Sequence, residues 1–198
     1  MFLKKLVKQN LEPTLIYDCE TINCLPVGES NPNFTYCQSR EDFKGMGLSV
    51  VGAYASWTGR YHVFLNDNLD DFRNLVKQAK RIVGFNSLSF DDKLCWANNV
   101  QIKTNYDLLC EVRVAAGMPP HYVKGVTRKG YSLNDLAQAN LRIEKTGSGA
   151  IAPQLWQTGE KGKVIDYCLN DVMLLKELYQ QRKQIIDPTN QNLLHLPD

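Results

Sequence analysis

Residues 14–21, TLIYDCET, combine an apolar, β-branched run with two acidic residues at its end. The first five residues, 14–18, follow Pro13 and have the composition of a β-strand. Side chains two apart in a strand share a face, so Asp18 and Glu20 are expected to point the same way. Two carboxylates about 4 Å apart repel by roughly 4 kcal/mol at an effective dielectric constant of 20. Either one is protonated or a cation lies between them, unless the strand has ended and both are solvated.

Outward from this stretch, strand-like and helical patterns alternate. Residues 23–45 are rich in Asn, Pro, Gly and Ser, and are predicted to form a long loop. Residues 48–55 and 60–65 are apolar runs joined by a turn with Gly59, which predicts a hairpin. Spacing and composition then predict, in order, helix, strand, helix, weak strand and helix over residues 69–80, 81–85, 89–99, 104–107 and 108–116.

The last third of the chain is mainly helical in pattern. A loop over residues 117–130 carries Lys124, Arg128 and Lys129. Ser132, with an acidic residue three positions later, predicts the capped start of a helix that runs to residue 141. The remaining predicted elements are a short helical piece around residues 153–157 and a long amphipathic helix over residues 163–186.

The order of elements predicts an α/β fold. A hairpin followed by alternating helices and strands indicates a mixed five-stranded sheet, antiparallel at one edge and parallel in the other half, flanked by helices. The length of 198 residues and the hydrophobic content of 43% suit one domain over residues 1–198, with a core of about 14–186.

Composition excludes several classes of protein. The net charge of +2 does not indicate a general nucleic-acid binder, so a basic surface must be local. The charged start is atypical of a signal peptide and no apolar run is long enough to span a bilayer. We therefore expect a cytoplasmic protein with free thiols and no membrane partner. A zinc site from Cys19, Cys24 and Cys37 is conceivable, although their spacing is not that of paired zinc ligands.

A third acidic position follows the apolar run at residues 81–85. Asp91 comes after Asn86 and Phe90 at the junction of a predicted strand and helix, and ligands in such sheets bind beyond the carboxyl ends of strands. Alternatively, Asp91 or Asp92 simply caps the helix N-terminus. Asp92 could be the cap while Asp91 faces a site.

Tyr167 and Asp171 are four residues apart in the long helical pattern, so they share a helix face and could address one target. The alternative is a partly buried aromatic residue on an amphipathic helix. Tyr131 and Asp135 repeat the spacing, but Ser132 as the N-cap places that tyrosine outside its helix.

These motifs together resemble a known family. A strand ending in D-x-E-T, a strand leading into N-x3-F-D and a late helix with Y-x3-D resemble the tyrosine-bearing (DEDDy) branch of the 3′–5′ exonucleases, which have the RNase H-like fold. The closest likeness is to exonuclease domains of family B DNA polymerases and their stand-alone relatives. It runs from about Leu15 to about Tyr179 and includes SLNDLAQANL, residues 132–141. Cys19 stands where an aliphatic residue is more usual, and strand alternation turns it away from the site.

The resemblance implies a catalytic set of Asp18, Glu20, Asp91, Tyr167 and Asp171. The four carboxylates are expected to hold two Mg²⁺ or Mn²⁺ ions, with Asp18 bridging both and Tyr167 orienting the attacking water. The expected substrate is a single-stranded 3′ end, with DNA favoured, and the expected products are 5′-mononucleotides. Any polymerase or helicase partner is expected to be a separate chain.

Substrate contacts and rival functions complete the hypothesis. The residues expected to contact substrate are Thr21, Ile22, Asn86, Arg128 and Lys145. Three tryptophans could stack on bases or simply pack: Trp57, Trp96 and Trp156. Rival functions are an RNA-trimming exonuclease, another nuclease on the same fold, a catalytically inactive nucleic-acid-binding module and a purely structural interaction domain.

Overall fold

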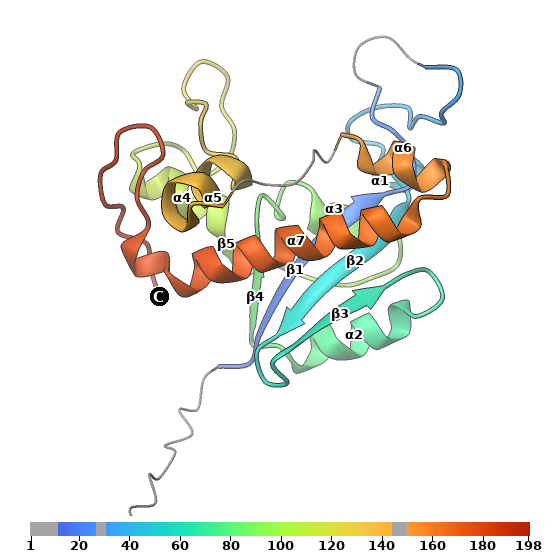
Figure 1. Cartoon of the computed structure of the whole chain (residues 1–198), viewed down its shortest axis with the longest axis horizontal. Coiled ribbons are helices and arrows are strands. Elements are labelled where there is room, and N and C mark those ends of the chain that lie inside the picture. Colours follow the sequence, from blue (N-terminus) through green and yellow to red (C-terminus); the bar gives the residue numbers. More distant parts are fainter. Residues whose placement is uncertain (1–11, 27–30, 144–149) are drawn as a thin grey trace, which may run out of the picture.

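The computed structural model describes residues 12–26, 31–143 and 150–198 (Figure 1). It contains a five-stranded sheet in the order β3-β2-β1-β4-β5. The strands are β1 (Thr14–Thr21), β2 (Leu48–Ala55), β3 (Arg60–Phe64), β4 (Arg81–Gly84) and β5 (Tyr106–Asp107). β1 pairs antiparallel with β2, and β2 antiparallel with β3, whereas β1, β4 and β5 run parallel. The predicted mixed sheet, antiparallel at one edge and parallel in the other half, is confirmed.

Helices cover both faces of this sheet. They are α1 (Phe43–Met46), α2 (Leu69–Gln78), α3 (Asp91–Ala97), α4 (Leu108–Ala115), α5 (Leu133–Leu141), α6 (Ala152–Gln157) and α7 (Lys161–Gln180). α7 crosses one face over β1 and β2, while α2 and α3 lie on the other (Figure 1). α5 and α6 pack on α7, so α7 joins the helical layer to the sheet.

Alternation along β1 assigns its side chains to these two faces. Leu15, Tyr17 and Cys19 pack in one core cluster with residues of α2 and α3. Ile16 packs in the other cluster with residues of α7. Asp18 has the parity of Ile16, so the acidic end of the strand faces α7.

Three predicted boundaries differ from the structure. The helix expected over residues 163–186 ends at Gln180 and is followed by a short 3₁₀ turn, Arg182–Gln184. Tertiary contacts end it, because Ile185 is fully buried with an extended backbone and Asp187 accepts a hydrogen bond from Tyr131. The helix expected over residues 89–99 is shorter, since α3 spans only seven residues. The loop expected over residues 23–45 includes the start of α1, which the Asp42 side chain caps.

Gly52 allows α7 to approach the sheet closely. It pairs with Asp18 across β1 and β2, and a Cβ there would lie 3.0 Å from Cys168 Sγ and 3.2 Å from Val172 Cγ2. We expect Gly52→Ala to lower the free energy of unfolding by about 1–3 kcal/mol, because α7 must shift outward. Urea denaturation measures this. Gly162→Ala on α7 is the control, since a Cβ there meets no atom of the described structure within 4 Å, and it should be neutral or stabilising by up to about 1 kcal/mol.

Candidate active site

A cavity of about 660 Å³ lies at the carboxyl end of β1. Its wall contains Asp18 from β1, Asp91 from the start of α3, and Tyr167 and Asp171 from α7. Four of the five residues expected in the catalytic set therefore meet at one hollow, although they come from three separate elements.

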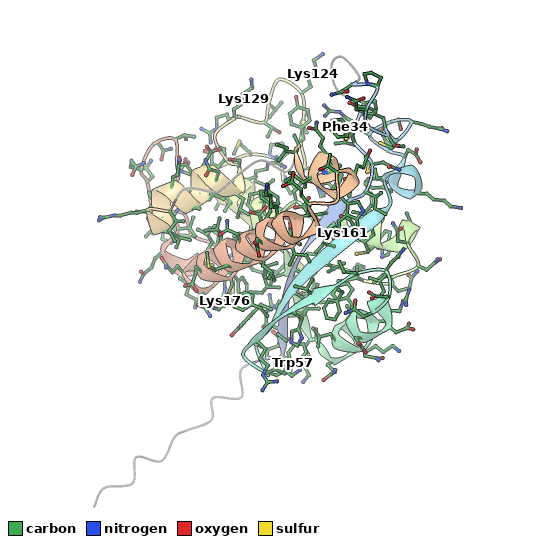
Figure 2. The ribbon with its side chains drawn as sticks, turned by 45° about the vertical axis from the view of Figure 1, so that its right-hand side comes forward. Phe34, Trp57, Lys124, Lys129, Lys161 and Lys176 are labelled. Atoms are coloured by element: carbon green, nitrogen blue, oxygen red, sulfur yellow. The ribbon has the colours of Figure 1, made fainter. Side chains whose placement is uncertain are left out.

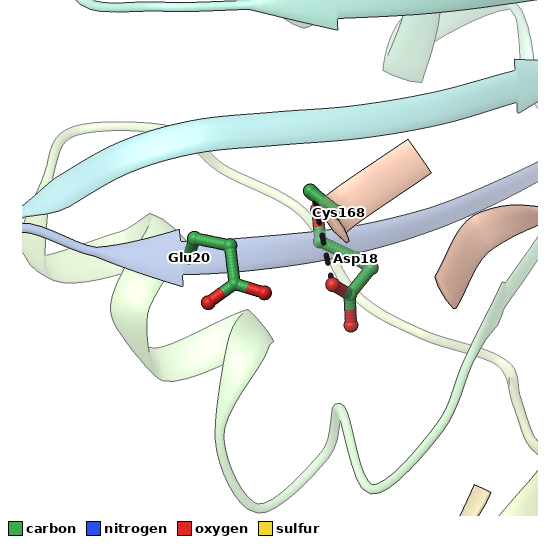
Figure 3. Close-up of side chains that lie close together, drawn as sticks. All are labelled: Asp18, Glu20 and Cys168. Carbon is green, nitrogen blue, oxygen red and sulfur yellow. Dashed lines mark hydrogen bonds between the residues drawn. The ribbon is translucent and has the colours of Figure 1, made fainter. Parts of the chain in front are cut away.

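Glu20 lies beside this hollow. It lines a neighbouring cavity of about 530 Å³, and Phe90 belongs to the walls of both cavities. Carboxylate oxygens of Asp18 and Glu20 and the sulfur of Cys168 all lie within 4.8 Å of one another (Figure 3). The strand therefore presents both carboxylates on the α7 side, as alternation predicts.

Burial makes Asp91 an unusual carboxyl group. Its side chain is 5% exposed, and Oδ1 accepts a hydrogen bond of 3.2 Å from the backbone N–H of Cys19. Burial raises the pKa of Asp91 to about 7, backbone hydrogen bonds oppose the shift, and the charges of Asp107 and Asp92 add to it. A bound cation at this position would favour the ionised carboxylate.

Tyr167 is held in its protonated form by the same environment. Burial raises the pKa of its phenol, and the negative charges of Asp171, Glu20 and Asp18 raise it further. At neutral pH the phenol is therefore a hydrogen-bond donor rather than a base. This agrees with the expected role of orienting a water molecule.

Asp92 has a different environment from its neighbour Asp91. It is 1% exposed, and its carboxylate accepts hydrogen bonds from Tyr17 Oη at 2.5 Å and from Thr104 Oγ1 and N at 2.9 and 3.0 Å. The N-cap of α3 is Phe90, so the expectation that Asp92 caps the helix is wrong. Asp92 instead ties α3 to β1 and to the segment before β5, and Asp91 is the carboxylate at the cavity.

Asp107 is a further residue that the sequence reasoning missed. Its carboxylate accepts hydrogen bonds from the backbone N–H groups of Asn86 at 2.9 Å and Leu88 at 3.1 Å, and it also caps α4. The capping position before an apolar helical run was the available signal. Asp107 thus fixes the segment that leads to Asp91, in which Asn86 has a positive φ of 61°.

The residues expected to contact substrate are distributed unevenly. Asn86 and Arg128 line the main cavity, and Thr21 lines the neighbouring one. Ile22, among the described residues, lines neither, because its side chain lies against Gly47 and its N–H bonds to the backbone there. Lys145 lies outside the described residues.

The loop between α4 and α5 forms the basic and aromatic side of the main cavity. Tyr122, Arg128 and Lys129 from this loop line it, and Tyr122 is 69% exposed. Figure 2 shows Lys124 and Lys129 at one end of the molecule and Trp57 at the other. A stacking role for Trp57 at this cavity is therefore not supported.

The other tryptophans and the cysteines have structural contacts. Trp57 and Trp156 pack against core clusters, and Trp96 Nε1 donates to the Ile102 carbonyl. All six cysteines are free thiols, as expected. Within the described ranges, the only group of His, Cys, Asp and Glu ligands close enough to share a metal ion is Asp18, Glu20 and Cys168. The conceived zinc site of Cys19, Cys24 and Cys37 is therefore not formed, and Cys19 instead packs its sulfur 3.6 Å from Cys95 Sγ.

Comparison with known proteins places this architecture. No known family model and no curated protein matches the sequence. Among solved structures, the family B DNA polymerase of the hyperthermophilic archaeon Pyrobaculum calidifontis is similar, with a TM-score of 0.58 and 18% sequence identity over 86% of this chain. The fold is RNase H-like. The chain spans about a quarter of that polymerase, since the match covers 24% of its length. No helix in the described segments is both long and apolar enough to cross a bilayer.

Proposed function

We propose that this chain is a metal-dependent 3′–5′ exonuclease that removes 5′-mononucleotides from single-stranded nucleic acid, with DNA preferred. The convergence of Asp18, Asp91, Tyr167 and Asp171 on one cavity, with Glu20 beside it, supports the proposal most directly. The RNase H-like sheet supports it further, because the similar solved structure is that of a family B DNA polymerase.

The carboxylates suit hard divalent cations. Asp18, Glu20, Asp91 and Asp171 offer oxygen ligands only, which Mg²⁺ and Mn²⁺ favour over nitrogen and sulfur. Three of these four carboxylates are buried, and Asp91 has a raised pKa without a cation nearby. Two ions held by the four carboxylates would lower the pKa of a bound water and stabilise the charge that develops on the phosphate.

The chain itself would orient and bind the reactants. Tyr167, protonated at neutral pH, would donate a hydrogen bond that positions the attacking water or the phosphate. Arg128 and Lys129, on the far wall of the cavity, would neutralise phosphates of the strand. Asp107 would keep the Asn86–Leu88 backbone in place and so aim Asp91.

The exposed ring of Tyr122 gives the first substrate prediction. Because it lines the cavity beside two cations, we expect it to stack on a base of the bound strand. Tyr122→Ala should weaken binding of a single-stranded oligonucleotide by about 1–3 kcal/mol, the usual contribution of one stacked base. Fluorescence anisotropy in Ca²⁺ buffer, chosen to prevent cleavage, measures the affinity. Tyr61→Ala is the matched control, since Tyr61 is 42% exposed but lines a separate pocket with α7 residues; equal losses in both variants would contradict the prediction.

The deciding experiment for the function is a cleavage assay. The full-length protein is incubated with 5′-labelled single-stranded DNA or RNA in Mg²⁺ or Mn²⁺, beside EDTA controls. A ladder that shortens from the 3′ end and vanishes in EDTA supports the proposal, and the relative rates identify the preferred sugar. Internal cuts would indicate another type of nuclease, and faster trimming of RNA would indicate the RNA-acting alternative. Binding without cleavage under every condition would leave an inactive nucleic-acid-binding module.

A further inference from the structure

Cys168 brings a sulfur atom to the edge of the carboxylate cluster. It follows Tyr167 on α7 and is fully buried, and its Sγ accepts a hydrogen bond of 3.2 Å from the Gly52 N–H. The same sulfur lies 3.4 Å from the Asp18 carbonyl oxygen and 3.6 Å from Asp18 Oδ2 (Figure 3). Gly52 makes this approach possible, because any larger residue there would collide with the sulfur.

The spacing of these atoms matches a tetrahedral metal site. A Zn²⁺ ion with a Zn–S bond of about 2.3 Å and a Zn–O bond of about 2.1 Å holds its sulfur and oxygen ligands about 3.6 Å apart. Asp18 Oδ2 and Cys168 Sγ are separated by 3.6 Å. An oxygen of Glu20 lies within 4.8 Å of both, which is close enough for a side-chain rotation to complete three ligands.

The ligand types then select the ion. Mg²⁺ and Mn²⁺ bind carboxylate oxygens and have little affinity for sulfur, whereas a thiolate favours softer cations. Zn²⁺ also stands above Mn²⁺ in the general order of affinities for sites of this kind. Three protein ligands leave a fourth tetrahedral position open to water.

We propose that Asp18, Glu20 and Cys168 form a binding site for a thiophilic divalent cation, with Zn²⁺ as the ion that fits. On binding, the thiol proton passes to solvent and the sulfur becomes a thiolate ligand. The ion uses two carboxylates that the proposed exonuclease reaction needs for Mg²⁺, so zinc would compete with magnesium. This consequence rests on the proposed function, whereas the binding itself rests on the geometry.

Co²⁺ is a suitable probe, because a cobalt–thiolate bond gives a charge-transfer absorption band in the near ultraviolet. We expect the band to appear when Co²⁺ is titrated into the metal-free full-length protein, and Zn²⁺ to abolish it by displacement. Cys168→Ser should remove the band and weaken cobalt binding by about tenfold or more, since loss of even an outer partner of a metal ligand costs that much.

Two controls locate the sulfur and guard against misfolding. Cys37→Ser should keep the band, because its thiol donates to the Ser39 carbonyl and a hydroxyl can replace it. If Cys168→Ser fails to fold, Glu20→Gln in the presence of Cys168 should still weaken cobalt binding. Cobalt binding without a thiolate band, or a band that persists in Cys168→Ser, would overturn the site. A thiolate band in a protein that cleaves no nucleic acid would instead overturn only the proposed function.

Discussion

Asp18→Asn should lower the rate of 3′-end hydrolysis by about a hundred- to a thousand-fold or more, the range seen when one preorganised electrostatic contact is removed from an active site. Asp18 lines the main cavity and lies within 4.8 Å of Glu20, so it is the carboxylate best placed to serve both proposed ions. Asparagine keeps the shape of the side chain and removes only its charge. The loss should therefore appear in the rate and not in the fold.

Stability separates this interpretation from a structural one. Without metal, the Asp18→Asn variant should unfold at the same or a higher urea concentration than the wild type, because one of two neighbouring negative charges is removed. Asp166→Asn is a matched control, since Asp166 is an exposed residue of α7 next to Tyr167 and lines a different pocket. A variant that keeps more than a tenth of the wild-type rate would argue against Asp18 as a metal ligand.

Asp92→Ala should have the largest effect on stability, lowering the free energy of unfolding by about 3 kcal/mol or more. Breaking a buried charged network typically costs 3–5 kcal/mol, because the remaining partners stay buried without an acceptor. The groups left behind are Tyr17 Oη and the N–H and hydroxyl of Thr104, which hold β1 and the segment before β5 against α3. Urea denaturation followed by circular dichroism measures the loss.

The neighbouring substitution Asp91→Asn is the informative comparison. Because Asp91 is a buried carboxyl whose pKa is raised to about 7, a neutral amide should leave stability unchanged or slightly higher in EDTA. The same change should reduce hydrolysis to a similar extent as Asp18→Asn. If Asp91→Asn unfolds the protein and Asp92→Ala does not, the roles assigned to these two residues are reversed.

Short-range physics made much of this protein readable from its sequence. Side-chain alternation along β1 placed Asp18 and Glu20 on one face and Cys19 on the other, because a strand has a period of two. The helix that begins after Ser132 has the predicted capping box, since its partners are three residues apart. The hairpin and the strand at residues 81–85 were also recognisable, because each depends on a local run of apolar residues.

Contacts between distant residues decided the rest. Asp91 and Asp92 are adjacent and chemically identical, and only the partners of Asp92, Tyr17 from 75 residues away and Thr104, distinguish the structural carboxylate from the one at the cavity. Cys168 lies beside Asp18 although they are 150 residues apart, because Gly52 lets α7 approach the sheet. The end of α7 likewise depends on the burial of Ile185 in the core. The sequence by itself determined which residues share a face of each element, and only tertiary packing decided which faces meet, because desolvation and hydrogen bonding act between elements that no local pattern connects.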